Sequence, residues 1–309
     1  MKKILVTGGA GFIGSHLCEY LIKKNNYVIC VDNLSTGNKN NISDLFNYEN
    51  FQFIDHDILE VLNIEVDEIY HFACPASPIQ YQINPINTFK TCIIGTMNII
   101  DLALKNNAKI LHASTSEIYG DPIQNPQNEK YWGNVNPIGV RSCYNESKRA
   151  IESLLFDYKR YENLKLKICR IFNTYGPNMD PNDGRVISNF INQALNNQPI
   201  TIYGQGNQTR SFCYVEDLIQ GIFKLMNKDN TINTPVNLGN PEEISILDLA
   251  KKIVLLTNSN SQINYKKLPE DDPKKRMPDI ELAKKLLLWK PKIKLDDGLK
   301  KTISYFNLM

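Results

Sequence analysis

Several features that mark nucleic-acid-binding, membrane or metal-binding proteins are missing from this 309-residue sequence. Its 35 Lys and Arg nearly balance its 33 Asp and Glu, whereas nucleic-acid-binding proteins usually show a basic excess on one face. No apolar run reaches about 18 residues, so we predict no membrane span. The pair Lys2-Lys3 leads straight into a short apolar stretch, so we expect no signal peptide and no N-terminal membrane anchor.

Histidine and arginine are also few, and neither histidine nor cysteine shows the spacing of a common metal site. The four His form no HxxxH pair and the seven Cys form no CxxC pair, so we expect no metal site. An odd number of Cys, several of them in apolar runs, is typical of reduced thiols in a cytoplasmic protein. Only seven of the 35 basic residues are Arg, so the position of each Arg is informative.

The first half of the chain alternates short apolar runs with segments of helical spacing. Strands joined by helices in this order predict right-handed βαβ units and a parallel sheet covered on both faces. We therefore predict an α/β fold, a Rossmann-type doubly wound parallel sheet. The expected strands are 3–7, 27–31, 51–54, 68–74, 109–114 and 166–173, and the expected helices are 12–24, 88–105 and 144–161.

The second half of the chain lacks the regular alternation of strand and helix patterns. Pro and Gly mark a loop over 175–184, and short strand patterns then mix with helical ones. We predict a first domain over 1–174 and a smaller C-terminal α+β domain over 175–309. Segments near 214–240 are expected to return to the first domain.

A glycine-rich loop lies between the first predicted strand and the first predicted helix. Gly8 permits a tight turn, Gly11 allows the backbone to approach a pyrophosphate, and Gly14 allows close helix packing. The helix N-terminus then offers N–H groups to phosphates. Asp32 ends the second strand, where its carboxylate would bind the ribose hydroxyls and repel a 2′-phosphate, so NAD is favoured over NADP. The alternative is a plain glycine turn followed by an ordinary strand-end acid.

Further residues are expected around the same cofactor. Asp57 and Ile58 follow the third strand, where an adenine edge would lie, although Asp57 as a solvated loop acid is an equally good interpretation. Phe12, Ile13 and Asn33 adjoin the glycine loop and the strand-end Asp, and we include them in the predicted NAD site.

A Tyr–Lys pair supplies candidate acid–base chemistry. Tyr144 and Lys148 are one helical turn apart and so face the same side. A free Tyr is a poor base at neutral pH, but a nearby ammonium and a positive nicotinamide ring would favour the phenolate. The pair could then take a proton from a substrate hydroxyl as a hydride leaves to NAD. The alternative is a surface i,i+4 pair.

Polar residues directly follow the fifth predicted strand. The carboxyl ends of strands in an open sheet face the ligand crevice. Thr115 would hydrogen-bond the reacting hydroxyl there, and Glu117 adds a carboxylate that simple hydride transfer does not need. An exposed loop acid is the alternative interpretation of Glu117.

These residues lie in long segments that resemble the extended short-chain dehydrogenase/reductase family, and within it the members that decarboxylate UDP-glucuronate. The match runs from Lys3 to about Phe306. Its main segments are PASP (75–78), ASTSEIYGDP (113–122), YWGNVNPIG (131–139), RSCY (141–144), IFNTYGP (171–177), DGRV (183–186), QTRSF (208–212) and DDP (271–273).

The resemblance implies a three-stage reaction on UDP-glucuronate. NAD oxidises the sugar at C4, the resulting β-keto acid loses CO2, and the NADH formed reduces the C4 ketone to give UDP-xylose. Tyr144 would be the C4 base, Lys148 would orient it, and Thr115 would assist. Glu117 and Arg276 would serve decarboxylation and C5 protonation, although a tight ion pair from Arg276 to the substrate carboxylate would stabilise the ground state and slow CO2 loss.

The resemblance also implies that the first domain binds NAD and that the second mainly binds the sugar nucleotide. A homodimer through the helices 88–105 and 144–161 is expected by the same analogy. Arg suits a diphosphate because its fork donates two hydrogen bonds. Thr174 would contact the cofactor, and the residues expected at the sugar nucleotide are Lys90, Tyr158, Asn173, Arg185 and Arg210.

Two alternatives to this function remain open. A sugar-nucleotide 4,6-dehydratase of the same family would carry an Asp-Glu pair, but Ser116 occupies the Asp position, and 4-epimerases lack the Glu. A catalytically silent NAD-binding regulator would typically lose the Tyr–Lys pair, which is present. One departure from the family pattern is Cys92, which stands where Asn is usual beneath the cofactor.

Overall fold

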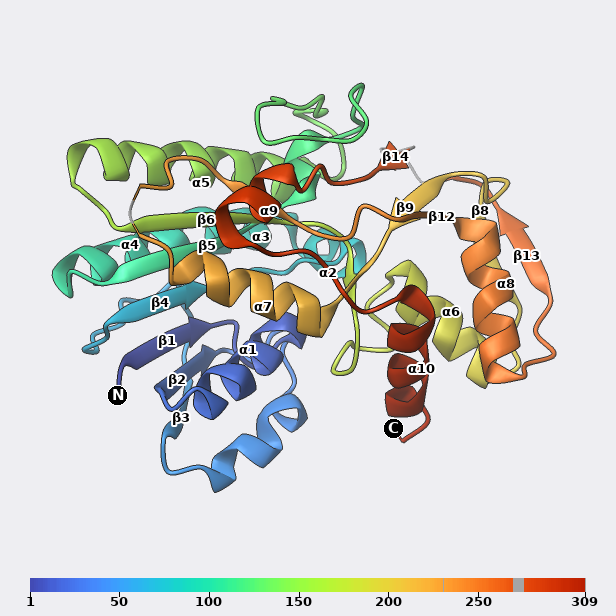
Figure 1. Cartoon of the computed structure of the whole chain (residues 1–309), viewed down its shortest axis with the longest axis horizontal. Coiled ribbons are helices and arrows are strands. Elements are labelled where there is room, and N and C mark those ends of the chain that lie inside the picture. Colours follow the sequence, from blue (N-terminus) through green and yellow to red (C-terminus); the bar gives the residue numbers. More distant parts are fainter. Residues whose placement is uncertain (230, 269–274, 309) are drawn as a thin grey trace.

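A computed structural model describes residues 1–229, 231–268 and 275–308 as a larger lobe built on one sheet and a smaller C-terminal lobe (Figure 1). The motif at 271–273 lies outside the described residues. No helix within the described ranges is long and apolar enough to cross a membrane.

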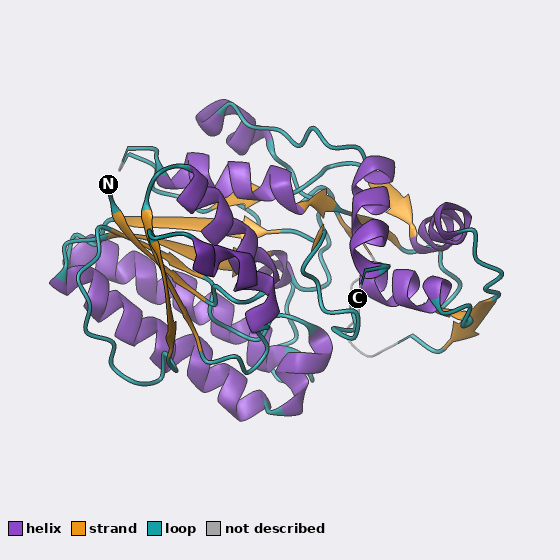
Figure 2. Ribbon diagram, turned by 90° about the horizontal axis from the view of Figure 1, so that it is seen from below, coloured by secondary structure: helices purple, strands orange, loops and turns teal. Residues whose placement is uncertain are grey.

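Seven strands form the main sheet, and every neighbouring pair in it is parallel. The side chains of six of these strands are mostly buried because helices cover both faces (Figure 2), whereas those of one edge strand, Phe51–Asp55, are only partly buried. The order across the sheet is β11 (Val236–Leu238), β6 (Leu166–Ile171), β5 (Lys109–Thr115), β4 (Glu68–His71), β1 (Lys3–Thr7), β2 (Tyr27–Asp32) and β3 (Phe51–Asp55). The predicted α/β doubly wound sheet is confirmed, and β4 and β6 end two to three residues earlier than expected.

Two separate apolar cores show which helices cover each face. One core packs α1 (Phe12–Lys23) and α7 (Val215–Met226) on one side of the sheet and continues into the C-terminal lobe. The other packs α4 (Thr96–Lys105) and α5 (Ser142–Tyr161) on the opposite side. The 20-residue α5 runs the length of the sheet (Figure 1).

The expected helix over 88–105 is not regular. The chain forms α2 (Pro78–Ile83) and α3 (Pro85–Lys90), a π-helical turn η2 (Thr91–Gly95), and then α4. Within this turn the Thr96 hydroxyl donates a hydrogen bond back to the carbonyl of Cys92 at 2.5 Å. A π-helical turn of this kind is hard to predict from the sequence, because it shifts the spacing of apolar residues along the helix by only one position.

The C-terminal lobe is a set of helices and three small sheets. Its strands pair as β8 (Ile200–Tyr203) with β13 (Ile263–Lys266), β7 (Thr174–Tyr175) with β10 (Cys213–Tyr214), and β9 (Thr209–Ser211) between β12 (Glu243–Ser245) and β14 (Lys275–Arg276). From the second half of the chain, β11 joins the main sheet as the edge strand beside β6, and α7 packs against that sheet. The remaining elements are the helices α6 (Val186–Leu195), α8 (Ile246–Thr257), α9 (Glu281–Leu287) and α10 (Leu295–Phe306), and the 3-10 segments η1 (Lys39–Asn47) and η3 (Ser116–Tyr119).

Candidate active site

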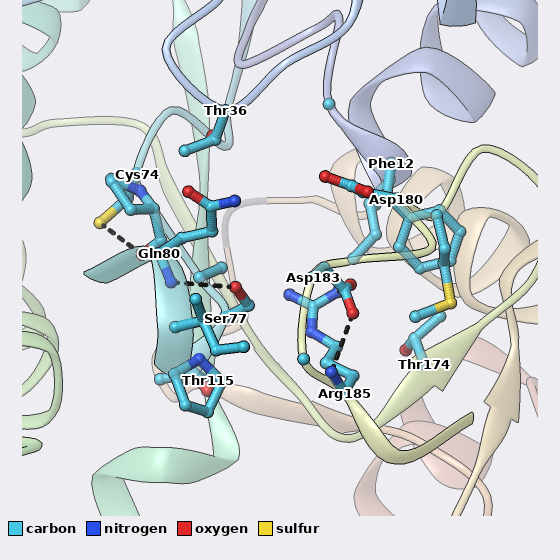
Figure 3. Close-up of a pocket in the computed structure, with 18 of the residues that line it drawn as sticks. Phe12, Thr36, Cys74, Ser77, Gln80, Thr115, Thr174, Asp180, Asp183 and Arg185 are labelled. Carbon is cyan, nitrogen blue, oxygen red and sulfur yellow. Dashed lines mark hydrogen bonds and ion pairs between the residues drawn. The ribbon is translucent and has the colours of Figure 1, made fainter. Parts of the chain in front are cut away.

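A cavity of about 1090 Å³ lies at the carboxyl ends of the parallel strands. Its walls come from the loops after β1, β2, β3, β4, β5 and β6 and from the C-terminal lobe. In Figure 3, Ser77 and Thr115 lie on one side of the cavity, and Asp183 and Arg185 lie on the other. This volume is at the upper end of the range for single-ligand sites, so the cavity has room for a cofactor and a substrate together.

The glycine loop after β1 forms one end of the cavity. Gly8 has a φ of 69° and its N–H donates to Val31 O at 2.8 Å, which closes the turn against β2. A Cβ at Gly8 would lie 2.8 Å from the backbone N of Ala73, and a Cβ at Gly14 would overlap the Gly8 carbonyl. Gly11 caps α1 without any side-chain hydrogen bond, so the N–H groups at the start of α1 face the cavity.

Acidic residues follow next along the same wall. Asp32 lines the cavity, and its two oxygens accept hydrogen bonds from Ala10 N at 3.0 Å and Leu34 N at 2.9 Å. An ionised carboxylate has about four acceptor sites, so it can bind ribose hydroxyls as well. Burial raises the pKa of Asp32, and the amides of Leu34 and Ala10 oppose the rise. Asn33 donates to Asp57 at 3.0 Å, beside Ile58.

The glycine cradle, the uncapped helix start and the strand-end carboxylate fit a dinucleotide such as NAD. All the residues predicted for the cofactor line the cavity, namely Gly8, Gly11, Phe12, Ile13, Gly14, Asp32, Asn33, Asp57, Ile58 and Thr174.

The Tyr–Lys pair lies deep in the cavity on α5. Tyr144 and Lys148 are both almost fully buried, and Lys148 Nζ donates to Ala113 O at 2.8 Å and lies 5.9 Å from the Tyr144 ring centroid. The Tyr144 ring stacks on Tyr81 with the centroids 5.0 Å apart. The surface-pair alternative is therefore wrong, because neither side chain is at the surface.

The electrostatics of Tyr144 differ from the simple expectation. Burial raises the pKa of Tyr144, and nearby Cys74 adds to the rise, while a hydrogen bond with Thr115 opposes it. In the absence of the cofactor, the ammonium of Lys148 does not offset the rise in the pKa of Tyr144. The positive nicotinamide ring is therefore the part of the expected arrangement that would have to favour the phenolate.

Glu117 lies in η3 and has a cation beside each of its oxygens. Oε1 forms an ion pair with Arg276, whose second terminal nitrogen donates to Gly120 O at 2.8 Å. Oε2 lies 3.8 Å from Nη1 of Arg141. Burial alone would raise the pKa of Glu117, but Arg276 and Arg141 outweigh it and the net pKa is lowered. Glu117 is thus an ionised, partly enclosed carboxylate rather than an exposed loop acid.

Arginines gather on the C-terminal side of the cavity. Arg276 pairs in register with Arg210 across β14 and β9, and both line the cavity. Arg185 lies at the start of α6, 3.5 Å from Asp183 (Figure 3), and Asn173 also lines the cavity. The position of Arg141 beside Glu117 is not evident from the RSCY segment that contains it. The scarcity of Arg is the signal that could have singled it out.

Two residues predicted for the sugar nucleotide lie away from the cavity. Lys90 is exposed at the end of α3, and Tyr158 packs against the core beneath α5. Tyr158 is 14 residues from Tyr144 on one helix, which at ~1.5 Å per residue places it about 21 Å along the axis. The structure therefore gives neither residue a position on the cavity wall.

Comparisons with known proteins agree with this geometry. A sequence model of a family described as GDP-mannose 4,6 dehydratase matches residues 5–302. UDP-glucuronic acid decarboxylase 4 of Arabidopsis thaliana is 53% identical over 96% of this chain and 67% of its own length. UDP-glucuronic acid decarboxylase 1 of Danio rerio is 53% identical over 99% of this chain and 73% of its own length.

A solved structure extends the comparison. UDP-glucuronic acid 4-epimerase from Bacillus cereus, in complex with UDP-glucuronic acid and NAD, superposes with a TM-score of 0.90 at 31% identity, covering 99% of each chain. The chain spans about two thirds of the length of the first two Arabidopsis relatives it matches. On these similarities, the chain belongs to the extended short-chain dehydrogenase/reductase family, in the group of the UDP-glucuronic acid decarboxylases.

Proposed function

We propose that this protein converts UDP-glucuronate to UDP-xylose and CO2, with NAD reused in every turnover. The observation that carries the proposal is the Glu117–Arg276 ion pair, which lines the same cavity as Tyr144 and Lys148. Hydride transfer alone needs only the Tyr–Lys pair. A dehydratase would need an acid at position 116, where the chain has Ser116.

Gly8, Gly11 and Asp32 would hold NAD, which would supply a hydride acceptor for C4 of the sugar and the hydride donor for the last stage. Tyr144 takes the C4 hydroxyl proton as the hydride leaves, and gives it back when the ketone is reduced. Thr115 supports this transfer through its hydrogen bond with Tyr144. Lys148 holds its ammonium against the end of β5, where it favours the phenolate once the cofactor is present.

Decarboxylation follows from the chemistry of the oxidised sugar. The electrons of the breaking C5–C6 bond move toward the C4 carbonyl oxygen, CO2 leaves, and C5 then takes a proton. The Tyr144 hydroxyl donates a hydrogen bond to that oxygen. Glu117 is an ionised carboxylate beside Arg276, so we assign the C5 proton to a water molecule that this pair orients, and not to Glu117 itself. Arg185 and Arg210 would hold the diphosphate.

The cofactor preference depends on Asp32. We expect Asp32→Asn to weaken NAD binding by about tenfold, because it loses a charged acceptor for the ribose hydroxyls. NADP binding should improve, because the negative charge that repels a 2′-phosphate is gone. Titration calorimetry with each cofactor measures both changes. The control is Asp55→Asn, since Asp55 neighbours Asp32 across β2 and β3 but does not line the cavity; equal effects of both variants would contradict the assignment.

We also propose that the protein is a cytoplasmic homodimer. All seven cysteines are free thiols, which supports a reducing compartment. Exposed apolar side chains gather on the segment from α3 to α4, including Ile86, Phe89, Ile94 and Met97. This segment packs beside α5, so the two helices predicted for the dimer lie together. A patch of this kind on a soluble protein is typical of an interface.

Charging this patch should separate the subunits. We expect the double variant Ile94→Glu/Met97→Lys to run as a monomer, because burying two charges in an apolar interface is strongly unfavourable. Light scattering coupled to size exclusion gives the mass. Leu255→Glu is the control, because Leu255 is an exposed apolar side chain, 75% accessible, that lies on α8 and outside the patch. A native protein of monomer mass would disprove the dimer.

The function is tested by product analysis. The purified protein should convert UDP-glucuronate to UDP-xylose without added NADH. Parallel incubations with UDP-glucose and dTDP-glucose should give neither a 4-epimer nor a 4-keto-6-deoxy sugar. Formation of either product, or of UDP-galacturonate from UDP-glucuronate, would assign the chain to an epimerase or dehydratase activity instead.

A further inference from the structure

The helix of the Tyr–Lys pair carries another buried polar residue, Glu152, one turn beyond Lys148. Tyr144, Lys148 and Glu152 follow at spacings of four residues, and all three are buried. Lys148 Nζ donates to Ala113 O at 2.8 Å, and Ser114 Oγ donates to Glu152 Oε1 at 2.5 Å. This face of α5 is therefore fastened to two consecutive residues of β5, just before the strand ends in the cavity.

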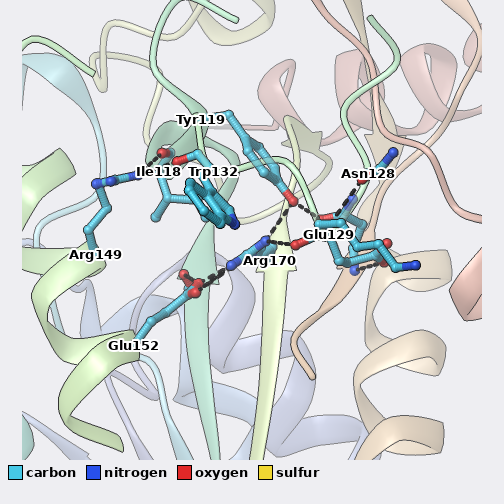
Figure 4. A network of polar contacts seen from close by, with 11 residues as sticks. Ile118, Tyr119, Asn128, Glu129, Trp132, Arg149, Glu152 and Arg170 are labelled. Carbon is cyan, nitrogen blue, oxygen red and sulfur yellow. Dashed lines mark hydrogen bonds and ion pairs between the residues drawn. The ribbon is translucent and has the colours of Figure 1, made fainter. Parts of the chain in front are cut away.

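Arg170 on β6 joins this helix face to the turn that carries Glu117. Its Nε and Nη2 donate to Glu152 at 3.0 and 2.7 Å. Its Nη1 donates to the Tyr119 hydroxyl at 2.9 Å and to Glu129 O at 3.0 Å. Figure 4 shows Arg170 between Glu152 and Tyr119. Tyr119 ends η3 two residues after Glu117, so the Arg170 guanidinium links α5, which carries Tyr144, to the turn that carries the Glu117 carboxylate.

The same chain of hydrogen bonds continues toward Arg276. The Tyr119 hydroxyl donates to Asn237 Oδ1 at 2.9 Å, and Asn237 Nδ2 donates to Gln127 O at 3.0 Å. Gln127 N donates to Met277 O at 2.9 Å, and Met277 N donates back to Gln127 Oε1 at 3.0 Å. Met277 directly follows Arg276, so the network ends beside the partner of Glu117.

The network is buried and complete. Gln127 and Asn237 have no exposed surface, and burial raises the pKa of Tyr119 to about 12, so its hydroxyl keeps the proton it donates. Among the described residues, the buried polar atoms of Glu152, Arg170, Tyr119, Asn237 and Gln127 all have hydrogen-bond partners, whereas Glu117 Oε2 and Arg276 Nε, in the pair that the network leads to, form no hydrogen bond. A satisfied buried network of this kind is rigid, because any displacement leaves a charge or a dipole unpaired away from water.

We propose that Glu152 and Arg170 are positioning residues that keep the Glu117–Arg276 pair in register with Tyr144 and Lys148. The inference rests on the proposed function, because that reaction needs both pairs to act in succession on one bound sugar. A displacement of ~1 Å can cost about a hundredfold in rate. A loosened network should slow the return of the hydride, so that some sugar leaves as the 4-keto pentose with one NADH formed for each molecule released.

Two mild variants test this role. Tyr119→Phe removes one hydroxyl from the network. Arg170→Lys keeps the positive charge but loses the planar guanidinium whose N–H groups bond Glu152 and Tyr119 together. We expect either variant to lower kcat for UDP-xylose by roughly tenfold with KM changed less than about twofold. The 4-keto product and NADH should rise together above the native level. Amide hydrogen exchange should accelerate over 116–121 and 275–279, and this second measurement needs no substrate.

Matched controls separate positioning from general destabilisation. Tyr70→Phe removes a buried hydroxyl that has no hydrogen-bond partner. Glu68→Gln removes the charge of Glu68, which lies on β4 away from the cavity and forms a partly buried ion pair with Lys2. Neither control should alter the product ratio or local exchange. An unchanged product ratio and unchanged exchange in Tyr119→Phe and Arg170→Lys would overturn the inference. A native protein that makes no UDP-xylose would instead refute the proposed function, and the exchange data would still decide whether the network holds the two segments.

Discussion

Tyr144→Phe is expected to lower the rate of UDP-xylose formation by about a thousandfold, the scale of a lost general acid–base group. The variant keeps the ring that stacks on Tyr81 and loses only the hydroxyl that reaches Thr115. Binding of NAD and of UDP should therefore stay within about twofold of the native protein, because these ligands meet other residues of the cavity. Steady-state kinetics measures the loss in rate, and titration calorimetry measures the binding of NAD and UDP.

The control for this variant is Tyr70→Phe, which removes a buried hydroxyl outside the cavity. It should leave the kinetics unchanged. If Tyr144→Phe retains more than about a tenth of the native rate, another group must take the C4 proton and the assigned base is wrong.

Glu117→Gln is expected to have the second-largest effect, with UDP-xylose formation falling by roughly a hundredfold. The amide keeps the shape of the side chain but leaves the buried guanidinium of Arg276 without its counter-charge. Because Arg276 and Arg141 outweigh burial and lower the pKa of Glu117 below that of a free glutamate, the native carboxylate is ionised at neutral pH. The native pH–rate profile should therefore show no step from Glu117 in the neutral range.

The control for Glu117 is Glu216→Gln, which removes a carboxylate from a half-exposed pair with Lys301 on the surface. Exposed pairs of this kind contribute little, so the rate should not change. Near-native UDP-xylose formation by Glu117→Gln would remove the ion pair from the mechanism, and with it the observation that favours decarboxylation over other reactions of the family.

Local patterns in the sequence predicted the cofactor end of the molecule well. The glycine loop needs only seven consecutive residues and the helix that follows, so the amino-acid sequence alone is enough to place Gly8, Gly11 and Gly14. The order of strands and helices also predicted the parallel sheet, because βαβ connections have one hand.

Contacts between distant segments were not predicted, although the family resemblance assigned Glu117 and Arg276 to the same stage of the reaction. Glu117 and Arg276 are 159 positions apart, and nothing in their local sequence pairs them. The same resemblance put Lys90 and Tyr158 at the substrate, where the helix geometry does not place them. A resemblance transfers a residue's identity, but its position depends on the rise of the helix that carries it.

The buried network shows what sequence reasoning could not reach. Arg170 lies in β6, whose mostly apolar sequence is typical of a buried core strand. The local sequence does not distinguish a buried Arg from an exposed one. Its partners come from α5, η3 and the loop at Glu129. Only the packed fold brings these polar groups together, as it also brings Arg141 to Glu117.

The most direct test of the proposed reaction follows one hydrogen atom. The protein is incubated with UDP-glucuronate that carries deuterium at C4, without added NADH, and the product is examined by NMR and mass spectrometry. We predict UDP-xylose that retains the deuterium at C4, with one CO2 released per molecule and no net NADH. Loss of the deuterium to solvent or to free NADH, or a product that still carries its carboxylate, would contradict the account.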